Sequence, residues 1–269
     1  MTDQTESTSH DTEYLNILLD PLATCKQYRP KFGHGTGLTL AEFQTMYQAD
    51  PFYSWFGLDS PLLYAAHKAG GGMTSIYRQI GIGCQRLMQH ILMDMLGLTS
   101  EQSMWSYEVT KRDGKQQTLS LDGRIPINAI KDRSNRQAVT QWLRAACQTD
   151  GVSSDVKRVI KGAVFEVRQG YKSKDSKRQN ADLANAASAY ADAYLPVLLL
   201  LSTQIDDDLA ERYQNARWLI LRGATTGTAA TSTYVFCHEV LNYDLAGFFE
   251  RNSTRLRQEV EAILMTLLT

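Results

Sequence analysis

Alternating hydrophobic and polar positions in the middle of the chain predict a β-hairpin. In 105–109 (WSYEV) the large apolar residues Trp105, Tyr107 and Val109 alternate with polar ones, and in 117–121 (QTLSL) Leu119 and Leu121 do the same. A period of two is typical of a strand that buries one face. The Asp-Gly pair at 113–114 lies between the two segments and favours a tight turn. We therefore expect two antiparallel strands, the second of which ends at Asp122.

Three further apolar segments predict additional strands. They lie at 163–169 (AVFEVRQ), 196–203 (PVLLLLST) and 217–223 (RWLILRG). The second of them is apolar at consecutive positions, as in strands that are covered on both faces. We therefore expect it to be a central strand with parallel neighbours.

Hydrophobic residues that recur every three or four positions predict helices between these strands. A Thr-capped helix is expected from Leu40 to about Tyr47 and ends before Pro51. The remaining expected helices cover 75–97, parts of 127–162, 176–195, 206–216 and 246–268. The glycine-rich stretch 69–75 is expected to be a loop that precedes the helix at 75–97.

This order of elements indicates a mixed α/β protein in which helices flank a mixed sheet. We expect residues 1–12 to be disordered and residues 13–269 to form a single domain. Within that domain the sequence predicts a helical part at 13–100, a sheet core at about 101–223 and a C-terminal helical part at 224–269.

Composition narrows the class of protein only slightly. The chain is 43% hydrophobic and 21% charged and carries a formal net charge of −1, so bulk charge does not indicate a nucleic-acid partner. Its four cysteines lie far apart, which argues against a zinc site or a disulfide framework. The polar N-terminus lacks a signal-peptide pattern, and the longest apolar run is about half a membrane span. We therefore expect a soluble cytoplasmic protein with no membrane partner.

Candidate chemistry gathers in the segment 163–182. Glu166 and Arg168 are two positions apart and therefore project from the same face of the expected strand. If the strand that ends at Asp122 pairs with this one, two carboxylates and a cation converge at one edge of the sheet. Two carboxylates in close proximity need a cation between them, and Mg²⁺ is a hard cation that carboxylate oxygens bind. Asp122 and Glu166 are thus candidate metal ligands.

A strongly basic segment follows directly. Between Arg168 and Arg178 there are five basic residues and one acidic residue, a local charge of +4. The segment enters a helix N-terminus, where backbone N–H groups also attract phosphate. The candidate DNA-contacting residues are Lys172, Lys174, Asp175, Lys177, Arg178 and Gln179.

The two motifs "LSLDGRIP" and "FEVRQ", in this order of elements, resemble the PD-(D/E)XK nuclease superfamily and its type II restriction endonucleases. The resemblance covers roughly residues 75–223 and implies a restriction-endonuclease-like core with a helical N-terminal elaboration and a C-terminal helix. It implies that Asp122 and Glu166 bind Mg²⁺ and that a homodimer cleaves double-stranded DNA at a short specific site in the bacterial cytoplasm.

Arg168 occupies the position at which this family has a catalytic lysine, and arginine is a poor proton shuttle. Lys172 is the candidate for supplying the missing ammonium, so the catalytic set comprises Asp122, Glu166, Arg168 and Lys172. Asp182, after the basic segment, resembles a displaced acid found in one subgroup that reads CCGG-type sites.

Three alternatives remain open from the sequence. In the first, the protein is a DNA-binding protein on the same fold that has lost catalysis, with Arg168 as the sign of that loss. In the second, it is an unrelated α/β protein whose basic loop binds an anionic partner. In the third, Glu166 and Arg168 form an exposed ion pair on an edge strand and have only a structural role.

Overall fold

The computed structural model describes residues 10–110, 113–149, 151, 153–170 and 176–268, with the backbone alone at 176–183. The chain forms two compact units. Unit 1 comprises Met1–Tyr14 and Cys84–Glu250, and unit 2 comprises Leu15–Gly83 and Arg251–Thr269. None of the described helices combines the length and the apolar character that a bilayer span requires.

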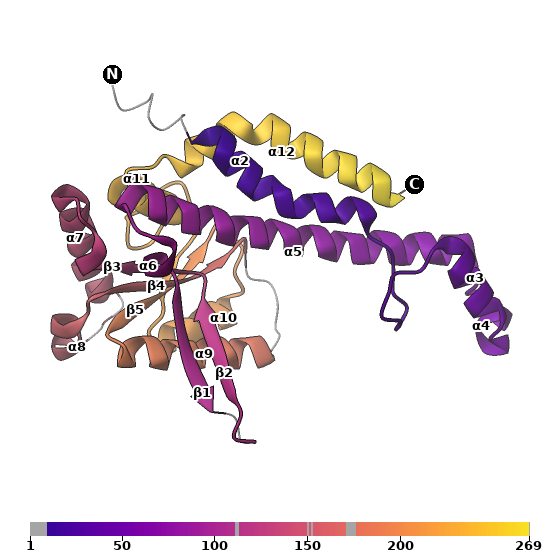
Figure 1. Ribbon diagram of the computed structural model, residues 1–269, viewed down its shortest axis with the longest axis horizontal. Coiled ribbons are helices and arrows are strands. Elements are labelled where there is room, and N and C mark those ends of the chain that lie inside the picture. The colour runs from indigo at the N-terminus through magenta and orange to yellow at the C-terminus, as the bar shows by residue number, and fades with distance from the viewer. Residues whose placement is uncertain (1–9, 111–112, 150, 152, 171–175, 269) are drawn as a thin grey trace. The chain divides into compact units, whose positions relative to one another are not determined.

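The fold belongs to the mixed α/β class, as the sequence predicts (Figure 1). The strands are β1 (Trp105–Thr110), β2 (Gln116–Leu121), β3 (Gly123–Pro126), β4 (Gly162–Arg168), β5 (Tyr194–Leu200) and β6 (Leu219–Leu221). The α-helices are α2 (Asp11–Leu19), α3 (Leu40–Gln48), α4 (Pro51–Trp55), α5 (Pro61–Leu96), α6 (Ser100–Ser103), α7 (Arg133–Thr149), α8 (Ser154–Val159), α9 (Ser176–Ala191), α10 (Asp207–Asn215), α11 (Thr233–Val240) and α12 (Leu245–Leu268). Two 3-10 helices are η1 (Asp20–Gln27) and η2 (Ile127–Ala129).

The main sheet of unit 1 contains four strands in the order β3-β4-β5-β6. β3 runs antiparallel to β4, whereas β4, β5 and β6 are parallel to one another. All seven residues of β5 are buried, and the strand lies in the interior of the sheet. The prediction of a central parallel strand from its continuous apolar run is therefore confirmed.

The predicted hairpin is also confirmed, but it is not part of this sheet. Among the described strands, β1 and β2 pair only with each other in a separate two-stranded sheet, with Trp105 opposite Leu121. The two acids were expected to converge if the strand that ends at Asp122 pairs with the strand that carries Glu166. The partner of β4 is instead β3, the short strand that begins directly after Asp122. The chain changes from one sheet to the other at this residue.

Both faces of the main sheet are covered by helices. On one face the ring of Phe165 lies 6.2 Å from that of Trp142 on α7 and 5.8 Å from that of Phe236 on α11, measured between centroids. On the other face Val164 belongs to a buried cluster that includes Ala186 of α9 and Tyr213 of α10. Strand β4 is thus buried from Gly162 to Val167, although it contains a carboxylate.

In unit 2 the helix α5 differs from the sequence-based expectation. The stretch 69–75 was expected to be a loop, but it lies inside α5, which begins at Pro61. A Cβ atom at Gly71 would overlap the hydroxyl of Tyr28, and one at Gly72 would lie 2.6 Å from Leu267 Cδ1. These glycines therefore permit close packing against the helix and do not end it.

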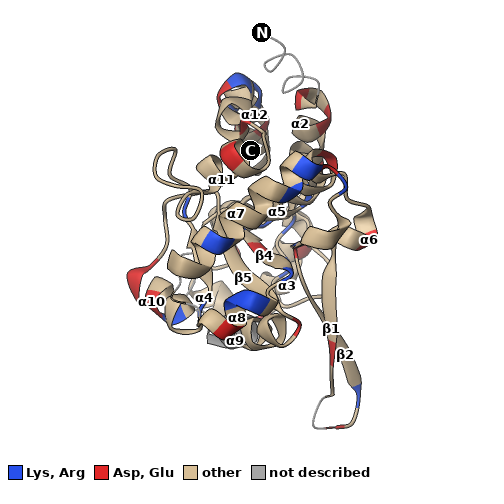
Figure 2. Cartoon of the chain, turned by 90° about the vertical axis from the view of Figure 1, so that its left-hand side faces the viewer, with Lys and Arg blue, Asp and Glu red and all other residues tan. Residues whose placement is uncertain are grey.

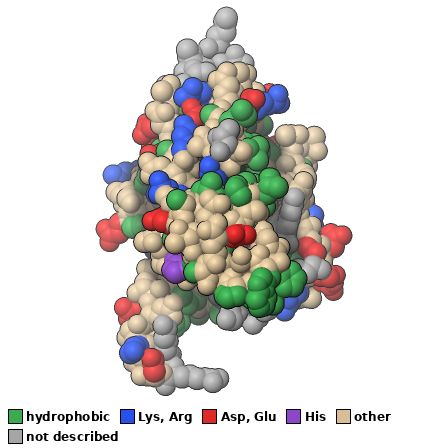
Figure 3. Space-filling view, turned by 90° about the vertical axis from the view of Figure 1, so that its right-hand side faces the viewer, with side chains coloured by type: hydrophobic (Ala, Val, Ile, Leu, Met, Phe, Trp, Pro, Cys, Tyr) green, Lys and Arg blue, Asp and Glu red, His purple; other side chains and the backbone are tan. Residues whose placement is uncertain are grey.

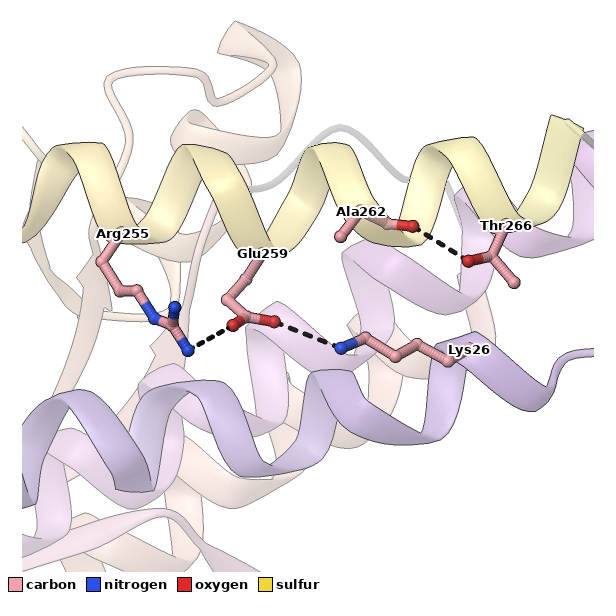
Figure 4. A network of polar contacts seen from close by, with 5 residues as sticks. All are labelled: Lys26, Arg255, Glu259, Ala262 and Thr266. Atoms are coloured by element: carbon pink, nitrogen blue, oxygen red, sulfur yellow. Dashed lines mark hydrogen bonds and ion pairs between the residues drawn. The ribbon is translucent and has the colours of Figure 1, made fainter.

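Polar contacts connect η1 to α12 in the same unit (Figure 4). Glu259 accepts a contact from Lys26 Nζ at 3.4 Å and one from Arg255 Nη2 at 2.6 Å. About two turns further along α12, Thr266 Oγ1 donates to the carbonyl oxygen of Ala262 at 3.0 Å. A buried cluster that includes Leu22 and Leu267 lies between the same two helices. The carboxylate of Glu259 thus links two segments that are far apart in the sequence.

The predicted Thr cap of α3 is confirmed. Thr39 Oγ1 accepts a hydrogen bond from the backbone N–H of Glu42 at 3.3 Å, and the backbone N–H of Thr39 donates to Glu42 Oε2 at 2.7 Å. This reciprocal pair is a capping box. The hydrogen bonds from Thr39 also lower the pKa of Glu42, first through the backbone N–H and then through the hydroxyl.

Gly162 provides a test of the strand pairing. A Cβ atom there would overlap the carbonyl oxygen of Ile125 on β3 and lie 2.9 Å from Tyr194 Cε1. We expect Gly162→Ala to force β3 and β4 apart and to lower the free energy of unfolding by about 1–3 kcal/mol, as other overpacking substitutions do. Urea denaturation measures this change. Gly81→Ala is the control, because a Cβ at Gly81 meets nothing within 4 Å. A Gly162→Ala protein as stable as the wild type would contradict this pairing.

Candidate active site

Asp122 and Glu166 occupy neighbouring positions on adjacent strands. Gly123 pairs with Phe165 in the antiparallel register of β3 and β4. Asp122 precedes the first of these residues and Glu166 follows the second, so the same register places the two acids beside each other. Opposite residues in antiparallel strands have Cα atoms about 4.5–5.5 Å apart. Two residues that are distant in the sequence are thus brought together at one end of β3.

Hydrogen bonds fix the orientation of the Asp122 carboxylate. Its Oδ2 atom accepts from the backbone N–H of Val167 at 2.8 Å and from Gln85 Nε2 at 3.1 Å. Gln85 Nε2 also lies 3.5 Å from the carbonyl oxygen of Val167. Two donors from different elements, β4 and α5, therefore hold this carboxylate in one place.

Gln85 is a candidate functional residue that the sequence analysis missed. It lies in the middle of α5, and a polar residue at such a position is ordinary in an amphipathic helix. No local pattern distinguishes it from Gln79 or Gln89 on the same helix. Its contact with Asp122 arises only because α5 packs next to the junction of β2 and β3.

Glu166 and Arg168 form a buried ion pair. The guanidinium Nη2 of Arg168 contacts Glu166 Oε1, and the two side chains are only 12% and 7% exposed. β4 lies between β3 and β5, so the alternative of an exposed pair on an edge strand is wrong. Burial of two charges costs free energy that their attraction often does not recover. The burial of this pair is therefore weak evidence that it was retained for stability alone.

Hydrogen bonds connect the hairpin to the C-terminal part of α9 and the residue that follows it. Tyr107 Oη of β1 donates to Asn185 Oδ1 of α9 at 2.7 Å, and Trp105 Nε1 donates to Asp192 Oδ2 at 3.2 Å. Asn185 is itself buried, so its side chain needs this partner. These contacts fix α9 against the hairpin and thereby position the helix that follows the carboxyl end of β4.

The structure places only part of the predicted DNA-contacting segment. Lys172, Lys174 and Asp175 lie outside the described residues. Lys177, Arg178, Gln179 and Asp182 lie on α9, the first three in its opening turn, where only the backbone is described. Because β4 ends at Arg168 and α9 begins at Ser176, the segment runs from the ion pair to the helix N-terminus.

A second group of basic residues, on α7 and α8, was not singled out from the sequence. Arg144, Lys157 and Arg158 line a groove of about 450 Å³ whose apolar floor includes Leu143 and Ile160. Figure 2 marks Lys and Arg positions on these two helices in blue. The groove adjoins the amino end of β4, whereas Glu166 and Arg168 lie toward its carboxyl end. The structure describes no direct contact between this groove and either Asp122 or Glu166.

The atoms near Asp122 that could serve as metal ligands are all oxygens. They are the carboxylate oxygens of Asp122 and Glu166, together with the carbonyl oxygen of Val167 near Gln85. Within the described part of the chain, no group of three or more His, Cys, Asp or Glu side chains has the arrangement of a metal site. An oxygen-only set of this size suits Mg²⁺, which keeps several waters, better than it suits zinc.

The chain matches no protein-family model, no curated protein sequence and no solved structure. Its function therefore has to be argued from the geometry of its own residues.

A double-mutant cycle tests the buried ion pair. We expect Glu166→Gln and Arg168→Met each to lower the free energy of unfolding by about 3–5 kcal/mol, because each leaves one buried charge without its partner. The double variant should lose less than the sum of the two single losses. Urea denaturation of the four proteins gives the coupling free energy. Asp155→Asn is the control, since its pair with Arg158 is exposed and should contribute less than about 1 kcal/mol. Additive losses would show that the pair is not coupled.

Proposed function

We propose that the protein is a Mg²⁺-dependent endonuclease that hydrolyses phosphodiester bonds of double-stranded DNA at a short specific sequence. One observation carries the proposal: the register of β3 and β4 puts Asp122 beside Glu166, two residues from the buried Arg168. The basic segment continues directly from this point into α9. Acidic ligands beside cations that attract phosphate are what phosphodiester hydrolysis requires.

The order of the elements supports this assignment. A long helix, α5, precedes the strand that carries the aspartate, and β4 is connected to the parallel strand β5 through α9. This is the order that we expect for a restriction-endonuclease-like core. Unit 1 contains all of these strands together with the C-terminal part of α5.

The residues around Asp122 fit Mg²⁺ because they offer only oxygen ligands. Asp122 and Glu166 would hold the ion, which would supply an activated water and stabilisation of negative charge on the phosphate. The backbone N–H of Val167 and the amide of Gln85 orient the Asp122 carboxylate. The guanidinium of Arg168 stabilises negative charge without exchanging a proton, since arginine stays protonated in proteins. Lys172 is the remaining candidate for the ammonium group that a catalytic lysine supplies in this family.

Double-stranded DNA is the proposed partner, and Lys172, Lys174, Asp175, Lys177, Arg178 and Gln179 are the proposed contacts. Backbone N–H groups at the start of α9 add to the attraction of phosphate. Contacts with phosphates position the protein on DNA, and contacts with base edges specify the sequence. Such an enzyme would act in the bacterial cytoplasm as part of a restriction system. It would act as a homodimer, because two strands have to be cut.

A second candidate function is DNA binding without cleavage. The buried pair of Glu166 with Arg168 favours it, because the guanidinium contacts an oxygen that metal binding would require. Cleavage assays with and without Mg²⁺ distinguish the two functions. The salt dependence of DNA binding distinguishes both from an unrelated protein with a basic loop, since phosphate contacts release counterions.

The two acids are the direct test of the nuclease proposal. We expect Asp122→Asn and Glu166→Gln each to abolish cleavage of plasmid DNA with Mg²⁺, while DNA binding persists or becomes tighter. Each change removes negative charge near the phosphate, which explains the retained binding. Glu239→Gln, an exposed acid on α11, is the matched control and should cut normally. Circular dichroism at the assay temperature confirms that each variant is folded. Near wild-type cleavage by either acid variant would exclude that residue as a metal ligand.

Substitution of the cations identifies the one that acts in catalysis. Arg168→Lys should retain measurable cleavage, because an ammonium at this position is what related nucleases use. Arg168→Ala should lower the rate by about 10² or more, as the loss of one preorganised electrostatic donor does. Single-turnover rates with saturating DNA measure both effects.

Lys172→Ala distinguishes the competing assignment. If it is inactive while Arg168→Ala cuts normally, the working cation is Lys172 and Arg168 is only the ion-pair partner of Glu166. A wild type that cuts no DNA with any divalent metal would leave the function as DNA binding alone.

A further inference from the structure

Unit 2 contains a pocket whose lining is basic and aromatic. Its volume is about 520 Å³, and the residues that line it are Lys26, Gln27, Tyr28, Arg29, Tyr64 and Lys68. The first four lie at the end of η1 and directly after it, and the last two lie in the opening turns of α5. Figure 3 shows Lys and Arg side chains among apolar ones on one face of the molecule. We call these six residues the η1–α5 pocket.

Positive charge exceeds negative charge around the η1–α5 pocket. Lys26 Nζ lies 3.4 Å from the carboxylate of Glu259, but Arg255 contacts the same carboxylate at 2.6 Å, so two cations share one acid (Figure 4). The side chains of Arg29 and Lys68 form no hydrogen bond or ion pair with the residues that the structure describes. Cations that converge on one pocket with too few acidic partners attract an anion from solution.

Two glycines permit the close packing that fixes the walls of this pocket. A Cβ atom at Gly71 of α5 would overlap the hydroxyl of Tyr28, and a Cβ atom at Gly37 would lie 2.5 Å from Arg29 Cβ. The ring of Tyr28 and the start of the Arg29 side chain are therefore held in place before a ligand binds. Walls that are already ordered lower the entropic cost of binding.

The ring of Tyr64 is held in place as well. Its hydroxyl donates to the carbonyl oxygen of Leu38 at 2.9 Å, and the ring stacks on that of Phe32 with centroids 6.2 Å apart. Burial raises the pKa of Tyr64, the positive charge of Arg29 opposes this rise, and the charge of Glu42 adds to it. The guanidinium of Arg29 is thus close enough to act on the phenol, so a ligand that binds Arg29 lies beside an aromatic ring.

This lining suits a nucleotide better than a simple anion. Three cations match the several negative charges of a diphosphate or triphosphate, since both Arg and Lys bind phosphate oxygens. Pockets of about 300–1,000 Å³ hold ligands much larger than a phosphate ion. Aromatic side chains stack on nucleobases, and the amide of Gln27 offers both a donor and an acceptor to the edge of a base.

The compactness of the pocket argues against a nucleic-acid strand as its occupant. Four of its residues are consecutive, and the other two, Tyr64 and Lys68, lie about one turn apart on α5, a rise of about 6 Å. Proteins that bind single strands use grooves that follow the backbone for about 4–16 nucleotides per domain. The bases of double-stranded DNA are stacked on one another and have to be flipped out before they can meet a tyrosine ring.

We propose that the η1–α5 pocket binds a nucleoside diphosphate or triphosphate. The phosphates contact Lys26, Arg29 and Lys68, and the base lies against the ring of Tyr28. All residues of this pocket belong to unit 2, whereas the two acids of the candidate active site belong to unit 1. The proposal therefore does not rest on nuclease activity.

Isothermal titration calorimetry of the full-length protein with ATP, and separately with pyrophosphate, tests the proposal. EDTA in the buffer removes metal ions, so that binding through a metal does not contribute. Lys68→Met and Arg29→Met should each raise the dissociation constants of both probes by about tenfold or more, because each removes a charge-assisted contact with phosphate.

Arg78→Met is the matched control for these two variants. It removes an exposed cation from α5 at about 15 Å beyond Lys68 along the helix, which exceeds the range of screened charges at physiological salt. The control should bind both probes as the wild type does. Circular dichroism confirms that all three variants retain their helices.

Substitution of Tyr28 tests the contact with the base. Tyr28→Leu should raise the dissociation constant of ATP by about fivefold or more and leave that of pyrophosphate unchanged, because stacking involves only the base. An equal loss of affinity for both probes would show that the pocket binds phosphate alone, which would overturn the assignment of a nucleotide.

Three other results would overturn the proposal. They are a wild type without saturable binding of ATP, an equal loss of affinity in Arg78→Met, and a single-stranded DNA oligomer whose binding Lys68→Met weakens and ATP does not displace. Asp122→Asn should bind ATP as the wild type does. Failure of the nuclease proposal and failure of this one are therefore distinguishable.

Discussion

The pairing of β3 with β4 is the constraint on which the candidate site depends. β3 is only four residues long, and its register sets Gly123 against Phe165. A shift by one residue would turn each side chain of β3 to the opposite face and would separate Asp122 from Glu166. A Cβ atom at Gly162 would overlap the carbonyl oxygen of Ile125, so the two strands approach closely at this point. The backbone pairing ends at Gly123 and Phe165. Beyond it, the backbone N–H of Val167 donates to the side chain of Asp122 and so holds the two segments together for one more step.

The position of β4 inside the sheet determines how the charge of Glu166 is balanced. Because β4 is covered by helices on both faces, Glu166 is buried and has to be neutralised within the protein. Arg168, two residues further along the same face, provides that neutralisation. The same guanidinium therefore stabilises the folded state and limits how Glu166 can bind a metal ion. In the nuclease that we propose, Arg168 has to serve both roles, which explains why it is the residue that decides between cleavage and binding alone.

The sequence determined the type and order of most elements. Alternation in 105–109 and 117–121 predicted the hairpin, and the continuous apolar run of β5 predicted a central parallel strand. Both follow from periodicity, which depends on neighbours along the chain. The spacing of Glu166 and Arg168 predicted their shared face for the same reason. The glycines at 69–75 were misinterpreted as a loop, since close packing against Tyr28 and Leu267 has no signal in the local sequence.

Tertiary structure decided which of these elements meet. Only the folded chain shows that Asp122 joins two sheets, that β3 and not β2 pairs with β4, and that Gln85 reaches Asp122 from α5. The burial of Glu166 also depends on helices that cover β4 from distant parts of the chain. Local patterns record which face of a segment is apolar, but they carry no information on the distant segment that covers it. The sequence therefore determined the candidate chemistry of this protein, and only the packing of distant segments brought that chemistry to one place.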